Sequence, residues 1–459
     1  ELFSVSFYVL CIVCAGIQVA KSRGASTNTP TTPDFKKFQQ VYLIVYFCSV
    51  MGDWLQGPYV YALYDYYKFS KQQIGVLFIV GFGTSMIFGS FIGQYADKYG
   101  RKLACLAYVV LYIVSCGTKH FGNFYILLFG RLTGGLATSI LFSAFESWMV
   151  AEHNKHFYPS EWSNNTFSLA TVGNGVCAIF AGWLGAMVRD SFNSLVAPFD
   201  AAIVFLAIAG AVIWFTWSEN KGDAAGLGSN RSDPRSKLTV ACDTFKNDPK
   251  VLLLGMIQSC FEGAMYIFVF MWTPKMEPLF KPLPHGQVFG CFMACMMIGS
   301  SVVDAVMKYR GPPQLYMRDV FGVGAVCMLA PAMLASDKYT CFISFFIFEA
   351  LCGVYWPSMG ILKSKYVPEE VRATVYNIFR VPLNLIVVLV LANLGTISDD
   401  TVFLVCAFLL AAAAVMQHIF MTMVMNGPVM DSMGPAALAT EELKPLDPNE
   451  EDLEIKGEK

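Results

Sequence analysis

Thirteen long apolar runs are the feature that most restricts what this chain can fold into. Each approaches the roughly 20 residues that a helix needs to cross the hydrocarbon core of a bilayer. The chain has 459 residues, of which 55% are apolar and 14% charged, whereas soluble domains carry about 25% charged residues. We therefore predict an all-α, polytopic membrane protein. The predicted spans are 2–20, 41–64, 74–95, 103–118, 122–150, 165–188, 196–217, 250–273, 286–308, 317–335, 339–362, 373–397 and 401–425.

A long polar segment at 218–249, rich in Gly and Ser, divides the spans after the first one into two sets of six. From about residue 429 the chain becomes acidic, a composition typical of disordered tails. The first span lacks a basic start and a small-residue cleavage site, so we expect a retained helix, with a secretory signal as the alternative. The predicted organisation is a hydrophobic helix and linker at 1–40, six-helix bundles at 41–217 and 250–425, a cytosolic loop at 218–249 and an acidic cytosolic tail at 426–459.

Lysine and arginine are distributed unevenly between the loops on the two sides. If the loop after span 2–20 is cytosolic, the cytosolic loops carry 20 of these residues and the opposite loops carry 7. Short loops rich in these residues stay on the cytosolic side of a membrane. We therefore expect the N-terminus outside and the C-terminus in the cytosol.

The two sets of six spans share short patterns. The segments "YPSEWSNNTF" (158–167) and "VPEEVRATVY" (367–376) both place Glu two residues after Pro, at an offset of 209 residues. The same offset maps Asp53 onto Glu262, and each lies in the first helix of its set. Together with the six-plus-six arrangement, these matches indicate a duplicated bundle of the kind found in transporters.

The segment "GQYADKYGRK" (93–102) lies in the short loop between the second and third spans of the first set. Glycines there permit tight turning, and a carboxylate is favoured near a helix N-terminus. We expect Arg101 to pair with Glu152 in a latch that closes the cytosolic side in one state; the alternative is an ordinary basic turn. The segment resembles the G-x-x-x-D-[KR]-x-G-[RK]-[RK] signature of the major facilitator superfamily at every fixed position, namely Gly93, Asp97, Lys98, Gly100, Arg101 and Lys102.

Six ionisable residues lie well inside the predicted spans, where a charge costs several kcal/mol and marks a functional candidate. The carboxylates outnumber the arginines, so at least one carboxylate is expected to be protonated in some state, as proton coupling requires. We assign this role first to Asp53 and Glu262, and the other two carboxylates are candidates for the same role or for charge pairs. The six residues are Asp53, Arg131, Glu146, Glu262, Glu349 and Arg380.

Arg380 is the strongest candidate for binding a substrate. It lies about eight residues into its helix, with Asn377 and Asn384 on nearly the same face. A fixed positive charge among amide donors suits an oxyanion. The amide of Gln56, beside Asp53, is expected to line the same cavity.

Arg131 and Glu146 are 15 residues apart in one predicted span. On a continuous helix they would be separated by about 60° and roughly 22 Å, so both would face one cavity at different depths. The alternative for the embedded charges is that they only pair with one another, Glu349 with Arg380 or Glu146 with Arg131.

Several segments together resemble the molybdate-anion transporter family, a branch of the major facilitator superfamily. They are "DWLQGPYVYALY", "GRLTGGLATSILFSAFESW", "FEGAMYIFVFMWTP", "CGVYWPSMG" and "FRVPLN". The resemblance runs from about residue 41 to residue 425. It implies a major facilitator fold of two six-helix bundles, in a plasma-membrane protein that imports molybdate. The site residues named above come from the chain's own pattern and not from the family.

Other functions are also compatible with these patterns. One superfamily fold carries many cargoes, so sulfate, another small anion or an organic solute is an alternative. A receptor or scaffold that uses the acidic tail is a second alternative. We do not expect an enzyme, a cofactor or a metal site, because no nucleotide-binding loop, metal cluster or nucleophile–histidine arrangement is present. The expected partners are the lipid bilayer and a small inorganic oxyanion, with no nucleic acid, in a monomer.

Overall fold

The computed structural model describes residues 2–24, 31–89, 91–222, 244–246, 248–334, 337–368 and 372–426, without the side chains of 22–24, 373, 374 and 377. Every regular element in these ranges is a helix. The helices up to the polar segment are α1 (Leu2–Gly24), α2 (Pro33–Trp54), η1 (Gly57–Tyr59), α3 (Val60–Tyr66), α4 (Lys71–Gly89), α5 (Ile92–Tyr99), α6 (Arg101–Gly117), η2 (Thr118–His120), α7 (Phe124–Leu141), α8 (Ala144–Lys155), α9 (Ser160–Phe192) and α10 (Ala197–Thr216). After it come α13 (Pro249–Met276), α14 (His285–Ser301), α15 (Val303–Arg310), α16 (Pro313–Met333), α17 (Lys338–Tyr366), α18 (Arg372–Ala392) and α19 (Asp399–Met425).

Several of these helices are capped at their N-terminus by a side chain. An oxygen side chain just before a helix can accept a hydrogen bond from a backbone N–H that the first turn leaves unpaired. Five helices start in this way, with caps from Thr32, Asn123, Asp248, Asp337 and Ser398.

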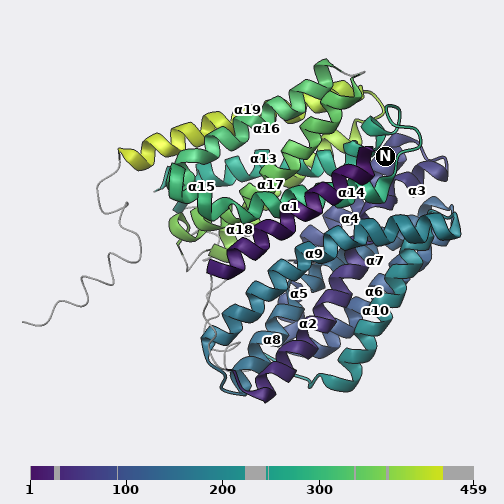
Figure 1. Ribbon diagram of the computed structural model, residues 1–459, viewed down its shortest axis with the longest axis vertical. Coiled ribbons are helices and arrows are strands. Elements are labelled where there is room, and N and C mark those ends of the chain that lie inside the picture. The colour runs from purple at the N-terminus through teal and green to yellow at the C-terminus, as the bar shows by residue number, and fades with distance from the viewer. Residues whose placement is uncertain are drawn as a thin grey trace, which may run out of the picture.

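The helices form two bundles that meet along two seams (Figure 1). We call α2 to α10 the first half and α13 to α19 the second half. Within each half the helices pack mainly on one another, α4 on α7 in the first and α16 on α19 in the second. The seams are α9 against α14 and α4 against α18. A site between the halves would therefore be bordered by both seams.

Helix α1 lies along α14, next to the seam with α9 (Figure 1). Its start and its end are both fixed to the second half. Ser4 donates to Gln287 at 3.0 Å, and Lys21 Nζ is 2.7 Å from an Asp304 oxygen. The two helices therefore run in the same direction, and α1 belongs structurally to the second half.

Several spans that the sequence predicts as continuous are broken. The predicted helix 41–64 is α2, η1 and α3, and the predicted helix 122–150 is α7 and α8, separated at residues 142–143. The predicted helix 74–95 divides into α4 and α5, and α14 and α15 meet at a bend of 41°. Of the helices that the structure describes, ten are long and apolar enough to cross a membrane, and the bent pair adds an eleventh. Helices α2 and α18 account for the two remaining expected spans.

The two ends of the molecule differ. We call the end that holds residues 93–102 the motif end and the opposite end the far end. At the far end, Lys71 of α4 and Asp399 of α19 form an ion pair of 2.7 Å between the halves. The backbones of α9 and α14 also approach so closely that a Cβ on Gly182 would lie 2.6 Å from the carbonyl oxygen of Gly286. Among the described residues, the ion pair between the halves lies at this end, so the halves are joined there.

Candidate functional site

Two cations and a carboxylate gather on the inner side of the second half. Glu262 of α13, Lys363 of α17 and Arg380 of α18 lie within electrostatic reach of one another. Arg380 is exposed, and its guanidinium lies 3.7 Å from the position that a Cβ on Gly89 of α4 would take. Arg380 therefore faces the space between the halves. We call these three residues the charged cluster.

Glu262 is held in place by a hydroxyl group. The side chain is 5% exposed, and the Tyr355 hydroxyl of α17 donates to its Oε1 at 2.9 Å. Lys363 is half-buried, with its Nζ 4.7 Å from the ring centroid of Tyr376. The charged cluster carries one net positive charge when Glu262 is ionised and two when it is protonated. Such a cluster suits an anion whose binding depends on that proton.

Aromatic rings close the charged cluster toward the far end. Glu262, Tyr266 and Phe270 are spaced by four residues, so they share one face of α13 and follow each other toward the far end. The ring of Tyr266 is 5.1 Å from Phe82 of the first half. The ring of Phe270 is 5.0 Å from Phe78, also of the first half. The site is therefore covered on the far side by contacts between the halves.

The first half repeats the carboxylate–hydroxyl pair. Asp53, on the first helix of that half, accepts a hydrogen bond from the hydroxyl of Tyr112 on α6. The Tyr112 hydroxyl also lies 3.3 Å from the Thr138 hydroxyl of α7. Gln56 follows the break after α2, is buried, and donates its amide to the carbonyl of Gly52 at 2.9 Å. The amide nitrogen of Gln56 is thus used within its own segment.

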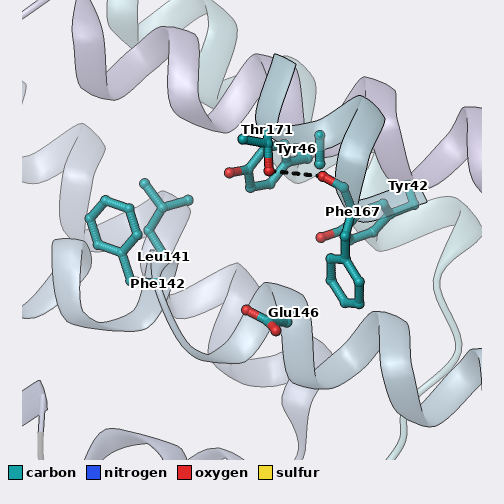
Figure 2. A pocket seen from close by; sticks show the side chains of 8 residues that line it. Tyr42, Tyr46, Leu141, Phe142, Glu146, Phe167 and Thr171 are labelled. Carbon is teal, nitrogen blue, oxygen red and sulfur yellow. Dashed lines mark hydrogen bonds between the residues drawn. The ribbon is translucent and has the colours of Figure 1, made fainter. Parts of the chain in front are cut away.

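Glu146 borders two hollows at the motif end. The smaller one measures about 130 Å³, and Figure 2 shows Glu146 across it from Tyr46 and Phe167. The larger one measures about 780 Å³ and has Arg101, Lys155 and Lys221 in its wall. The carboxylate of Glu146 is exposed. It is therefore accessible from the motif end.

Arg131 and Glu146 lie in one span, as predicted, but on two helices, α7 and α8, and not on one continuous helix. Helix α7 ends at Leu141 and α8 begins at Ala144, so the spacing of a continuous helix does not apply. Arg131 instead donates from Nε to the carbonyl of Leu77 on α4 at 3.1 Å. The predicted alternative pair with Glu146 is absent from the ion pairs of the described residues.

Glu349 has no cationic partner in the part of the chain that the structure describes. It is 5% exposed, and its Oε2 makes no hydrogen bond. Its helix, α17, is packed tightly on α14, since a Cβ on Gly353 would lie 2.0 Å from the carbonyl oxygen of Met296. The alternative pairing of Glu349 with Arg380 is not formed.

The amides predicted to donate to an oxyanion beside Arg380 are less available than expected. Asn384 donates its side-chain amide to the carbonyl of Arg380 itself at 2.7 Å. The side chain of Asn377 lies outside the described residues. The second donor near Arg380 is Lys363, which the sequence prediction placed in a loop just beyond a helix.

The predicted latch pairs differently from our expectation. Arg101 binds Asp97, four residues before it, at 2.7 Å. Glu152 accepts a hydrogen bond from Ser218 at 2.9 Å and contacts Lys155 at 3.2 Å. The expected pair of Arg101 with Glu152 is not formed in this structure, where Asp97 and Lys155 are the nearer partners; the latch in a closed motif end stays a prediction.

A residue that the sequence analysis did not select completes the motif. Glu219 accepts hydrogen bonds from the backbone N–H groups of Lys102 and Leu103, at 2.9 and 3.0 Å. These are orphan donors of the first turn of α6, where a carboxylate is favoured. Gly100 precedes that turn with φ of +131°, which explains the glycine.

The other motif residues have peripheral positions. Lys102 Nζ donates to the carbonyl of Trp217 at 2.7 Å, and Lys98 Nζ lies 5.2 Å from the ring centroid of Tyr99. A Cβ on Gly93 would meet nothing within 4 Å. Within the described residues, the motif thus joins α5, α6 and residues 218–222 of the first half.

Comparison with curated proteins gives close relatives over most of the chain. A molybdate-anion transporter of Takifugu rubripes is 32% identical over 417 residues, which cover 85% of this chain and 86% of the relative. A molybdate-anion transporter of Xenopus tropicalis is 33% identical over 418 residues, 87% of this chain and 89% of the relative. A major facilitator family model described as sugar transporters with 12 transmembrane segments matches residues 2–344.

Solved structures share the fold at low sequence identity. A mutant of the nucleoside transporter NupG superposes with a TM-score of 0.65 at 14% identity, covering 83% of this chain and 99% of that chain. The inward open conformation of the xylose transporter XylE from E. coli gives 0.62 at 11% identity, covering 84% and 96%. These matches agree with the two-bundle fold.

Proposed function

The chain belongs to the molybdate-anion transporter family of the major facilitator superfamily, and from this premise we propose that it carries molybdate across a membrane by alternating access. The observation that carries the proposal is the charged cluster. Arg380 and Lys363 lie near a single carboxylate, Glu262, on the second half, and Arg380 approaches Gly89 of the first half. Molybdate is a tetrahedral dianion, and two cations at one site provide the matching charge.

Glu262 is the proposed coupling residue. When it holds a proton, the cluster presents two positive charges to the dianion, and when it is ionised the cluster presents one. Proton and anion would therefore bind together and leave together. Asp53, which is held by Tyr112 in the same way, is the proposed second proton site, and exposed Glu146 the exchange point with the motif end. Glu349, which is buried and has no cationic partner among the described residues, is a further proton-holding candidate.

We place the protein in the plasma membrane as a monomer, with the N-terminus outside and the C-terminus in the cytosol. The excess of Lys and Arg in the motif-end loops supports this orientation. The far end then faces the outside, and the structure is an inward-facing form. The two halves, residues 41–217 and 250–425, would rock against each other to open the far end and bring the motif of residues 93–102 against the second half.

Uptake of labelled molybdate into proteoliposomes tests this function. Wild type should show saturable uptake that increases with an inward proton gradient. Arg380→Ala should lose about 10- to 100-fold in kcat/KM, the usual value of a charge-assisted hydrogen bond. Arg310→Ala is the matched control, because that arginine is exposed and pairs with Asp319 near the motif end.

The competitors in the same assay distinguish the alternatives. Sulfate that blocks uptake as well as molybdate would indicate a general oxyanion carrier. Uptake of a neutral sugar that is unaffected by Arg380→Ala would contradict an anion site. A folded wild type that takes up none of these solutes would favour the receptor or scaffold alternative.

A further inference from the structure

Arg131 occupies an unusual position on the inner side of the first half. Its guanidinium carbon lies 4.9 Å from the ring centroid of Phe78 on α4, and its Nε donates to the carbonyl of Leu77. Gly81 makes room for it, since a Cβ there would lie 2.5 Å from an Arg131 nitrogen. The guanidinium therefore lies over the Phe78 ring and close to α4 at Gly81.

The outer edge of this guanidinium is unused. Its terminal nitrogens make no hydrogen bond within the described residues, and they are not among the atoms sealed from solvent. No carboxylate of the described chain forms an ion pair with it. A guanidinium carries its hydrogen-bond donors in its plane and can bind an oxyanion there while its face contacts a ring.

The Phe78 ring connects Arg131 to the far-end closure. Phe270 of the second half packs edge-on against Phe78, with 5.0 Å between ring centroids. It also packs against Tyr61 of α3, at 5.1 Å. Phe270 is therefore held between two rings of the first half, and one of those rings is the one under Arg131.

We propose that Arg131 is a second oxyanion site, separate from the charged cluster, whose occupation loosens the Phe78–Phe270 contact and favours opening of the far end. This inference rests on the proposed anion transport. An anion at the edge of the guanidinium reduces the positive charge that holds the Phe78 ring against Arg131. A Phe78 ring that is held less firmly packs less firmly against Phe270. By linkage, release of the Phe78 ring strengthens anion binding to the same extent.

The strength of the cation–π contact limits the size of this effect. Contacts of this kind correspond to about a 2- to 30-fold change in an equilibrium constant, from about 0.5 to 2 kcal/mol at 1.36 kcal/mol per tenfold. Molybdate should therefore shift the far end toward the open form by a factor in this range. The anion cannot shift it further through this contact.

The test combines molybdate binding with hydrogen exchange on purified full-length protein. Exchange is followed in peptides of α3 and of the far-end part of α13, with and without molybdate, and binding is measured by titration calorimetry. In wild type, molybdate should accelerate exchange in these peptides about 2- to 30-fold. In Phe78→Leu, hydrogen exchange in these peptides should already be fast without molybdate. This variant should still bind molybdate, and binding should accelerate the exchange little further.

Three variants decide the result. Arg131→Gln should lose the exchange response while still binding molybdate at the charged cluster. Gly81→Ala should reduce the response, because its Cβ displaces the guanidinium, whereas Gly83→Ala, whose Cβ would meet nothing within 4 Å, should behave as wild type. A full response in Arg131→Gln, or molybdate binding to wild type without any response, would overturn this inference and leave the proposed function standing. A wild type that binds no molybdate would overturn both.

Discussion

Each half of the molecule holds a carboxylate with a tyrosine hydroxyl, Asp53 with Tyr112 in the first half and Glu262 with Tyr355 in the second. The arginines differ. Arg380 of the second half is exposed in the space between the halves, whereas Arg131 of the first half lies against an aromatic ring.

This difference shows how two halves with similar architecture can have different functions. In the second half, the arginine, a lysine and the carboxylate come together at one place, which makes a binding site. In the first half, the arginine lies against Phe78 of the far-end closure, and the carboxylate is bonded to Tyr112. We therefore assign anion binding mainly to the second half and the response of the far-end closure to the first.

The largest expected effect tests whether the second half is a rigid body. Gly353→Ala would place a Cβ 2.0 Å from the Met296 carbonyl oxygen, so α17 would have to move away from α14. We expect the free energy of unfolding to fall by about 3 kcal/mol. Gly360→Ala on the same helix meets nothing within 4 Å and should change it by less than about 1 kcal/mol. Thermal unfolding in detergent measures both, and equal stability of the two variants would show that α14 and α17 are loosely joined.

Two neighbouring aspartates at the start of α19 separate contacts inside a half from contacts between halves. Asp400 binds Lys275 at 2.6 Å, and that lysine is 7% exposed. Asp400→Asn leaves the Lys275 ammonium without a carboxylate partner and should lower the free energy of unfolding by about 2 kcal/mol. Asp399 binds Lys71 of the other half in a more exposed pair.

Asp399→Asn should therefore change the free energy of unfolding by less than about 1 kcal/mol. Its effect should appear as faster hydrogen exchange at the far end, and high salt should reduce the difference from wild type. If Asp399→Asn destabilised the fold as much as Asp400→Asn, the ion pair between the halves would belong to the permanent core.

The last comparison, of transport rather than stability, concerns the two tyrosines. Tyr355→Phe removes the donor to Glu262 and should lower kcat/KM for molybdate about tenfold, the value of roughly 1.4 kcal/mol for a hydrogen bond to a charged group. Tyr112→Phe removes the donor to Asp53, which lies away from Arg131. This variant should lower kcat/KM for molybdate less than Tyr355→Phe does. Initial uptake rates over a range of molybdate concentrations give both values. Equal losses would mean that the two halves share the coupling role.

The sequence was sufficient for the broad architecture. The apolar runs predicted an all-helical membrane protein, and the quoted segments predicted its family; both are confirmed. The orientation of the termini stays a prediction, because the structure contains no membrane.

The breaks within helices were not predictable from the apolar pattern. Residues 142–143 are Phe and Ser within an otherwise apolar run, with no Pro or Gly at the break to mark it. It separates Arg131 from Glu146. The Gly57–Pro58 dipeptide after α2 was a usable signal for the other break.

Side-chain partners were the least predictable level. Arg101 had a plausible partner in Glu152, but the closer Asp97 binds it, and Ser218 binds Glu152. Lys363 was counted with a loop because α17 extends beyond the predicted helix, to Tyr366. These outcomes depend on how distant segments meet, which residue spacing alone does not determine.

Equilibrium binding of molybdate to the purified protein tests the central claim, an anion site in the second half, most directly. The comparison is between wild type, Lys363→Gln with Arg380→Gln, and the control Arg189→Gln, whose arginine is exposed and pairs with Asp190. The account predicts that wild type and the control bind alike and that the double variant loses more than about 100-fold in affinity, as expected for two charge-assisted contacts. Unchanged affinity in a folded double variant would contradict it.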